Sequence, residues 1–291
     1  MGIEENQIVV GVDGSAADEL ALNWAIDDAL VRHVSLRLVC AHQWLPAAGR
    51  STGNDRPADH EHSLHLAEEV LSSALERAAV IGPSVRLQGQ AIEGSAASVL
   101  LDEAARASLL VVGSRQLKAF GSYFLGSVSG AVAARAGCPV IVVRGPAGEP
   151  AERPGVVVGV DGTEASQELL RFSFDHASRH RIPLRAILCW HPDLLAAMMW
   201  RAEPAAPTRA VAWLSEALAG WQEKFPDVLV QSAVIRDHPT AGLVEASLNQ
   251  DLLVVGNHGR HATTGTLLGS VSQGVLHHAY CPVAVIPTDI D

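Results

Sequence analysis

The fold is indicated most clearly by one stretch, Leu252-Leu-Val-Val-Gly256-Asn-His-Gly259-Arg-His-Ala-Thr-Thr-Gly-Thr-Leu-Leu-Gly269-Ser270-Val271-Ser272. An apolar run leads into two glycines three positions apart, and after nine more residues a Gly-Ser pair opens a second apolar stretch. That order predicts a strand, a glycine loop and a helix N-terminus. Glycine permits positive φ and close approach to a phosphate, and the N–H groups and dipole at a helix start attract anions. We therefore expect an anion-binding loop; a plain strand-to-helix connection capped by Ser270 is the alternative.

The loop occurs twice in the chain. Subtracting 143 from the residue numbers gives Val111-Val-Gly113-Ser-Arg115-Gln116, nine further residues and then Gly126-Ser127-Val128-Ser129. The Gly-Ser-Val-Ser tetrad is identical in both copies, but Gln116 stands where the later copy has Gly259. This recurrence favours a binding loop over a plain connection.

A second repeat marks the start of each half. Val9-Val-Gly-Val12-Asp13-Gly14-Ser15 recurs, at an offset of 148, as Val157-Val-Gly-Val160-Asp161-Gly162-Thr163. Two domains of about 145 residues suit the chain length. We expect them at residues 1–147 and 155–291, joined by a linker at 148–154 in a stretch rich in Gly and Pro. The offset between equivalent residues falls from 148 to 143 along the chain. The second half is therefore five residues shorter than the first between its second strand and its glycine loop.

Within each half, short apolar runs alternate with longer helical patterns, which predicts right-handed βαβ crossovers and a parallel sheet. With 48% apolar but only 4% aromatic residues, the cores must consist of Ala, Val and Leu, as in buried parallel sheets. The irregular segment 46–57 follows a strand and is a candidate lid. In the first half we expect strands at 7–12, 36–41, 84–92, 109–113 and 139–143, and helices at about 16–31, 59–80 and 95–107.

Charge and hydropathy exclude several classes of protein. A net charge of −11 without a basic block argues against gripping nucleic acid through its phosphates. No run approaches the roughly 18 to 20 apolar residues of a membrane span, and we expect a cytoplasmic protein. Four scattered cysteines, Cys40, Cys138, Cys189 and Cys281, form no Cys-x-x-Cys pair, so we interpret them as core residues and not as redox centres.

Asp13 and Asp161 end the first strand of each half, at the carboxyl edge where open α/β sheets bind ligands. A carboxylate there can accept hydrogen bonds from a base amino group or a ribose hydroxyl. Asp-Gly is also a common turn, which is the alternative for each. Trp190, directly after the second strand of its half, is a further candidate for the wall of a nucleotide pocket.

Enzymatic motifs fail on inspection, and we assign no catalytic residue. Neither loop ends in the Gly-Lys-Ser/Thr of a Walker A motif. Gly126-Ser-Val-Ser-Gly130 places Val128 where a nucleophile elbow needs serine. We also find no second carboxylate recognisably poised beside the cleft to hold a metal or orient water. The run His60-Glu-His-Ser-Leu-His65 has no counterpart in the other half, so we favour a solvated helix over a metal site.

Together these residues resemble the universal stress protein family, specifically its tandem ATP-binding members, over about residues 7–144 and 155–288. The motif Gly-x2-Gly-x9-Gly-Ser/Thr is complete in the second half and partial in the first, where Gln116 replaces the second glycine. The resemblance implies two α/β, Rossmann-like domains of the adenine nucleotide alpha hydrolase-like type. Each has a five-stranded parallel sheet of order 3-2-1-4-5 with helices on both faces.

The resemblance also implies the contacts of the nucleotide. Asp13 and Asp161 would lie at the adenine end, helped by the backbones of Ala41 and Cys189. Ribose and phosphates would be surrounded by Gly113, Arg115, Gly126, Ser127, Val128 and Ser129 in the first half, and by Gly256, His258, Gly259, Gly269, Ser270, Val271 and Ser272 in the second.

The expected ligand is ATP, and whether Mg²⁺ accompanies it stays open. The expected partners are the other half of the same chain, a second copy as a homodimer and an unidentified regulatory protein. Our first hypothesis is a regulatory nucleotide-binding protein of the stress response that is not an enzyme. One alternative is a slow ATP hydrolase or phosphotransferase that uses the same clefts. Another is a structural dimerisation protein with vestigial sites, which Gln116 supports because it interrupts the glycine motif.

Overall fold

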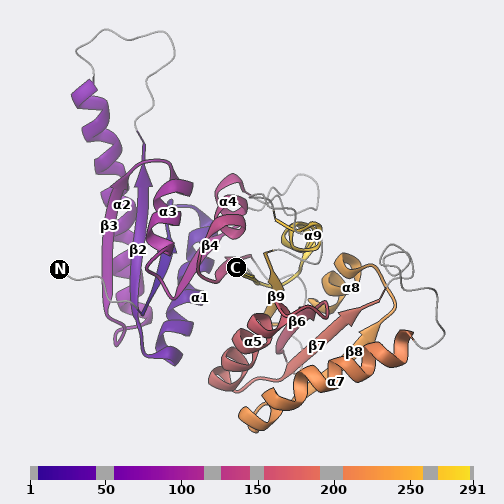
Figure 1. The fold of residues 1–291 in the computed structure, drawn as a ribbon. Coiled ribbons are helices and arrows are strands. Elements are labelled where there is room, and N and C mark those ends of the chain that lie inside the picture. Colours follow the sequence, from indigo (N-terminus) through magenta and orange to yellow (C-terminus); the bar gives the residue numbers. More distant parts are fainter. Residues whose placement is uncertain are drawn as a thin grey trace. The chain divides into compact units, whose positions relative to one another are not determined.

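A computed structural model describes residues 6–43, 56–114, 126–144, 154–190, 206–257 and 268–288. Contacts group them into two units (Figure 1), the first ending at Val143 and the second beginning at Arg144. Most of the expected linker at 148–154 lies outside the described residues, so its limits stay a prediction. Within the described ranges, no helix combines the length and apolar character that crossing a membrane requires.

The first unit alternates strands and helices along the chain. Its strands form a parallel sheet in the order β3-β2-β1-β4-β5. Helices α1 and α2 pack together on one face, and α3 and α4 pack together on the other. Its elements are β1 (Gln7–Gly11), α1 (Ala16–Arg32), β2 (Ser35–His42), α2 (Arg56–Ile81), β3 (Leu87–Glu93), α3 (Ala96–Ala104), β4 (Leu109–Gly113), α4 (Ser127–Arg135) and β5 (Val140–Val143).

The second unit repeats this topology, with the parallel order β8-β7-β6-β9-β10. Helices α5 and α7 cover one face, and α8 and α9 the other. The expected fold class and strand order are therefore confirmed. Its elements are β6 (Val156–Val160), α5 (Ser166–His180), β7 (Leu184–Cys189), α7 (Ala206–Lys224), β8 (Val230–Ile235), α8 (Pro239–Ala246), β9 (Leu252–Gly256), α9 (Ser270–His278) and β10 (Val283–Ile286).

Burial explains why short apolar runs became strands. The Leu-Leu-Val-Val residues of β4 and of β9 are all buried. A strand that is buried on both sides needs a helix layer on each face, which only a parallel sheet with crossover helices supplies here. The cores accordingly consist mainly of Val, Leu, Ile and Ala side chains, as the composition predicted.

Three predicted boundaries of helices and strands were wrong by three residues. Strand β3 begins at Leu87 and not at residue 84, because the Val85 N–H donates to the Gly82 carbonyl in a turn, N···O 3.0 Å. Helix α3 ends at Ala104 and not at 107, because short-range hydrogen bonds turn the chain toward β4. Helix α2 begins at Arg56, so the last two residues of the candidate lid are helical, while residues 44–55 lie outside the description.

Gly113 ends β4 directly against the first turn of α1. An ideal Cβ placed on Gly113 would lie 2.6 Å from the carbonyl oxygen of Ala17, far inside van der Waals contact. The obstructing atom is backbone, so relief would require a shift of the whole helix start. Close packing of α1 on the sheet therefore demands glycine at this position.

We predict that Gly113→Ala lowers the free energy of unfolding by about 1 to 3 kcal/mol, the usual cost of overpacking a rigid contact. Urea denaturation measures this change. Gly137→Ala is the matched control, because nothing lies within 4 Å of an ideal Cβ there. Equal stability of the two variants would contradict the packing argument.

Candidate functional site

Strand register brings each predicted aspartate to the same sheet edge as its glycine loop. Strand β1 pairs with β4 from Ile8↔Leu109 to Val10↔Val111, and β6 pairs with β9 from Val156↔Leu252 to Val158↔Val254. Asp13 and Asp161 follow β1 and β6, and the glycine loops follow the neighbouring strands β4 and β9. Paired strands lie about 4.8 Å apart, so each unit has an aspartate beside a loop at its carboxyl edge.

Both aspartates form the turns that the Asp-Gly sequence indicates. Gly14 and Gly162 have φ of 78° and 84°. The Ser15 N–H donates to Asp13 Oδ1 at 3.1 Å, and the Thr163 N–H donates to Asp161 Oδ1 at 3.0 Å. A carboxylate has about four acceptor sites, so a turn role is compatible with binding a ligand.

The two aspartates differ in the side chain that faces them. In the first unit, Asp18 Oδ2 accepts hydrogen bonds from the N–H groups of Asp13 and Gly14, both at 2.5 Å. In the second unit the equivalent residue, Ser166, accepts from the Asp161 N–H and donates to Asp161 Oδ1 at 3.0 Å. The first unit therefore has a second carboxylate beside Asp13, five residues further along the chain, that the sequence analysis did not single out.

Each glycine loop leads into a helix whose N-cap residue makes no side-chain hydrogen bond to the first turn in the described part of the chain. The N-caps are Gly126 and Gly269, which have no side chain to satisfy the first N–H groups, and neither first turn contains an acidic residue. Ser127 and Ser270 are exposed there, whereas Ser129 and Ser272 are buried. Such a terminus offers backbone donors and the positive end of the helix dipole to a phosphate.

The loop glycines that the structure describes do not adopt the positive φ that the sequence suggested. None of Gly113, Gly126, Gly256 and Gly269 is among the described residues with positive φ. Gly126 and Gly269 have φ of −63° and −57°, ordinary values for an N-cap. Gly126 and Gly269 bring no side chain of their own to the helix start, and Gly113 permits helix packing. Arg115, Gln116, His258 and Gly259 lie outside the described residues, so their predicted contacts stay predictions.

The second loop is fastened at both ends by hydrogen bonds. The Gly269 N–H donates to the Asn257 carbonyl at 2.8 Å, and Ser272 Oγ donates to the Gly256 carbonyl. Asn257 Oδ1 in turn accepts from the N–H and hydroxyl of Thr288. In the first unit Ser129 Oγ instead donates to the carbonyl of its own N-cap, Gly126, at 3.1 Å. The identical tetrads therefore make different bonds in the two units.

Ala41 and Cys189, predicted at the adenine end, lie at the ends of β2 and β7, where they pair with Ile92 and Ile235. Burial raises the pKa of the Cys189 thiol to about 11, and the charge of Asp237 adds to the rise. Cys189 is therefore a neutral thiol at physiological pH. Burial likewise raises the pKa values of Cys40, Cys138 and Cys281 to about 11 or 12, which supports their interpretation as core residues.

Trp190 is joined at this edge by a residue that the sequence analysis missed. The Arg236 guanidinium carbon lies 5.3 Å from the Trp190 ring centroid, a cation–π contact. The buried indole N–H of Trp190 has no hydrogen-bond partner among the described residues. His42 and Glu93 take these positions in the first unit, by the offsets of 148 and 143. The signal for Arg236 was its place directly after the third strand of its half.

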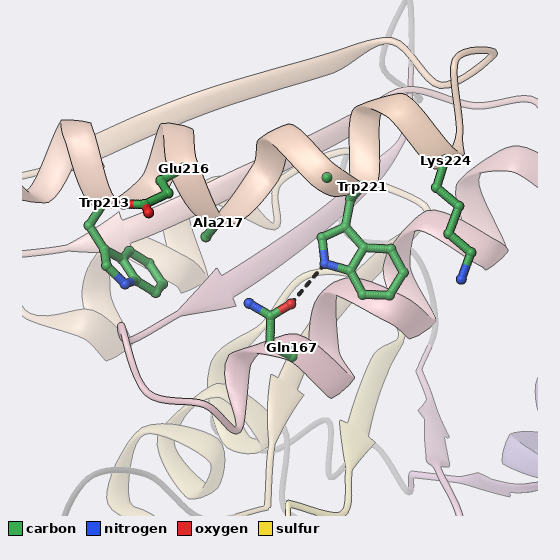
Figure 2. Close-up of a pocket in the computed structure, with 7 residues that line it drawn as sticks. Gln167, Trp213, Glu216, Ala217, Trp221 and Lys224 are labelled. Atoms are coloured by element: carbon green, nitrogen blue, oxygen red, sulfur yellow. Dashed lines mark hydrogen bonds between the residues drawn. The ribbon is translucent and has the colours of Figure 1, made fainter.

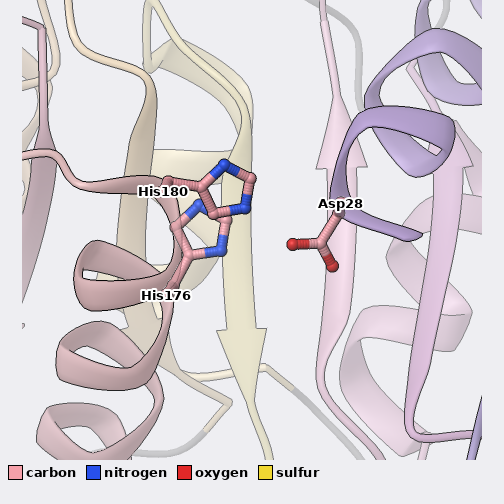
Figure 3. A group of neighbouring side chains, drawn as sticks. All are labelled: Asp28, His176 and His180. Carbon is pink, nitrogen blue, oxygen red and sulfur yellow. The ribbon is translucent and has the colours of Figure 1, made fainter. Parts of the chain in front are cut away.

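Histidines outside the clefts make local contacts. His65 lies 3.2 Å from Glu69 one turn along α2, and His60 lies 3.8 Å from Glu93. On α5 the imidazoles of His176 and His180 are stacked (Figure 3), with centroids 4.1 Å apart, and Phe172 stacks on His176 at 6.0 Å. Phe172, His176 and His180 therefore form a row of rings along one face of α5.

The carboxyl of Asp18 leads to a prediction of how the stability of the first unit depends on pH. Burial raises its pKa from 3.8 to about 6, the Asp13 charge adds to the rise, and the two backbone N–H groups oppose it. A raised pKa means that the folded state prefers the protonated acid. The contribution of Asp18 to the unfolding free energy should therefore be fully present below about pH 4 and be lost as pH rises through 6.

We predict that Asp18→Asn, which keeps the acceptor oxygen and removes the charge, stabilises the first unit at pH 7.5 by roughly 1 to 2 kcal/mol. This range allows for screening of a group that water partly reaches. Hydrogen exchange of the β1 amides at pH 4 and 7.5 measures the effect. Asp102→Asn, at an exposed carboxylate of α3, is the control. An unchanged pH dependence in Asp18→Asn would refute the assignment.

Comparison with known proteins agrees with this architecture. The model of the universal stress protein family matches residues 5–144 and again 154–287. The chain is 33% identical to universal stress protein Rv2005c of Mycobacterium tuberculosis, over 97% of each chain. It is also 33% identical to universal stress protein Rv2623 of the same species, over 96% of this chain and 95% of the relative.

A solved structure extends the comparison to the whole fold. The crystal structure of a universal stress protein from Archaeoglobus fulgidus superposes with a TM-score of 0.74 at 17% identity, covering 99% of this chain and all of the other. At that identity the likeness concerns the fold alone. Both family matches together span nearly the whole sequence, and the chain therefore belongs to the universal stress protein family, as a tandem of two such domains.

Proposed function

We propose that the protein is a regulatory ATP-binding protein of the stress response, in which the nucleotide is a ligand that biases conformation or partner choice. One observation carries the proposal. In each unit an aspartate turn lies one strand away from a glycine-capped helix start at the carboxyl edge of a parallel sheet. In open α/β folds this edge is where nucleotides bind.

The two ends of the cleft suit the two ends of ATP. A carboxylate such as Asp161 can accept a hydrogen bond from the amino group of adenine, whereas it would repel the carbonyl of guanine. The uncovered N–H groups of α9 supply neutral donors for phosphate, so binding needs no basic patch in a chain of net charge −11. Trp190, whose buried N–H has no partner among the described residues, adds a flat apolar wall for the base.

The second cleft is proposed as the stronger of the two. Its aspartate is bonded to the neutral hydroxyl of Ser166, whereas Asp13 lies against the carboxyl of Asp18. A second negative charge in the first cleft opposes the phosphates of ATP. The first half also has Gln116 where the second half has Gly259, and this difference likewise favours weaker ATP binding in the first cleft. Pairing of the halves, a homodimer and a regulatory partner stay proposals.

We predict that ATP binds more tightly than GTP, and that Asp161→Ala weakens ATP binding by roughly 1 to 3 kcal/mol, the range for losing a charge-assisted hydrogen bond. Calorimetric titration gives both affinities. Glu223→Ala, an exposed acid on α7, is the control for the loss of one negative charge. Equal affinities for ATP and GTP would contradict the assignment of Asp161 to the base.

We predict negligible turnover, far below the roughly 1 to 100 s⁻¹ of kinases, because neither loop has the Walker A ending and no catalytic base is assigned. ATP should survive prolonged incubation with the protein and Mg²⁺. Steady phosphate release that disappears in Ser270→Ala would establish the alternative, a slow hydrolase or phosphotransferase. Mass spectrometry of gently purified protein separates the cases: ATP supports binding, ADP or AMP supports hydrolysis, and no nucleotide favours a structural role.

A further inference from the structure

A groove lies between α5 and α7 of the second unit (Figure 2), and its lining includes none of the residues assigned to the nucleotide. It has a volume of about 600 Å³ and is open to solvent. Two tryptophans of α7 stand eight residues apart along it, with small residues between them. Its lining includes Gln167, Trp213, Glu216, Gly220, Trp221 and Lys224.

The first unit has the same groove, which allows a direct comparison. The α1 and α5 helices both end in a left-handed residue, at His33 and Arg181, which fixes an offset of 148 (181 − 33). The turns after α2 and α7 share a hydrogen bond, donated by Val85 and by Val228, which fixes an offset of 143 (228 − 85). The equivalent pairs are Glu19 and Gln167, Val70 and Trp213, Ser73 and Glu216, Arg77 and Gly220, and Ala78 and Trp221.

An arginine of the chain itself fills the groove in the first unit. Arg77 Nη1 reaches from α2 to Glu19 Oε1 on α1 at 3.0 Å. The groove there has a volume of only about 310 Å³. In the second unit Gly220 takes the place of Arg77, and an ideal Cβ on Gly220 meets nothing within 4 Å. The second unit thus has no side chain at the position from which Arg77 crosses the groove, and its groove is larger.

The walls of the larger groove suit a cation. Lys224 Nζ already lies 5.1 Å from the Trp221 centroid, and the Trp221 N–H donates to Gln167 Oε1 at 3.0 Å, which fixes that ring. In Figure 2 the Glu216 carboxylate points toward Trp213, on the side of the groove away from Lys224. No ion pair of Glu216 occurs within the described part of the chain. An indole face beside a carboxylate attracts a cation through its quadrupole and charge.

We propose that this groove binds the guanidinium of an arginine side chain presented by a partner polypeptide. Guanidinium is planar, stacks on indole rings and donates to carboxylates in a fixed fork, which favours arginine over lysine here. The groove is open, so a free small cation would bury little surface, whereas a polypeptide can also contact the helices around it. The net charge of −11 also favours a basic partner.

The test uses the full chain and two short peptides, acetyl-Ala-Ala-Arg-Ala-Ala-amide and its citrulline counterpart, whose urea group has the shape of guanidinium without its charge. NMR follows the indole N–H signals, assigned with Trp213→Phe and Trp221→Phe. We expect the arginine peptide to shift both signals saturably, with an affinity at least about tenfold above that of the citrulline peptide. Equal binding of the two peptides overturns the proposal, as does methylguanidinium binding as tightly as the arginine peptide.

Variants locate the site. Gly220→Arg restores the arginine of the first unit and should abolish peptide binding, whereas Gly220→Ala, which adds no cation, should retain it. Glu216→Gln should weaken binding about three- to tenfold, and Glu223→Gln, an exposed acid outside the groove, should not. Far-UV circular dichroism verifies that each variant is folded. Undiminished binding by folded Gly220→Arg would place the peptide elsewhere and overturn the proposal.

Discussion

The contact between the backbone of Ala17 and Gly113 is the constraint on which the first cleft depends. An ideal Cβ on Gly113 would lie 2.6 Å from the Ala17 carbonyl oxygen, so the start of α1 rests on the end of β4 itself. The turn that leads into α1 carries Asp13 and must therefore lie beside the loop that follows β4. A side chain at Gly113 would push the helix start away from this edge. Glycine serves packing at this position, and the cleft results from that packing.

The two units share one backbone plan but present different electrostatic surroundings. Where the first has the carboxyl of Asp18 against its aspartate, the second has the hydroxyl of Ser166. Where the first has His42 and Glu93 at the sheet edge, the second has the stacked pair Trp190 and Arg236. The parallel sheet tolerates these exchanges, because they lie at helix starts and at or just after the ends of strands.

The fold could be predicted from sequence because its signals are local. Apolar runs such as 109–113 are short, bounded by turns and repeated, and each became a buried parallel strand. The aspartate turns and the glycine-capped helices were likewise readable from neighbouring residues. The partnership of Asp18 with Asp13 was missed because it depends on how the helix start folds back over the turn. The α5–α7 groove was missed because Trp221 meets Gln167 only when the two helices pack.

Two adjacent positions on one helix link the cleft to the groove. Asp18 and Glu19 are consecutive in α1, and successive helical residues point about 100° apart. Asp18 therefore bonds to the turn at the cleft while Glu19 holds Arg77 across the groove. In α5 the same positions are Ser166 and Gln167, both neutral. The neutral pair in the second unit thus lacks both the negative charge beside the aspartate turn and the anionic partner of a bridging arginine. In each unit the first turn of this helix thus contains one residue that bonds to the aspartate turn and, directly after it, one that lines the groove between the two helices.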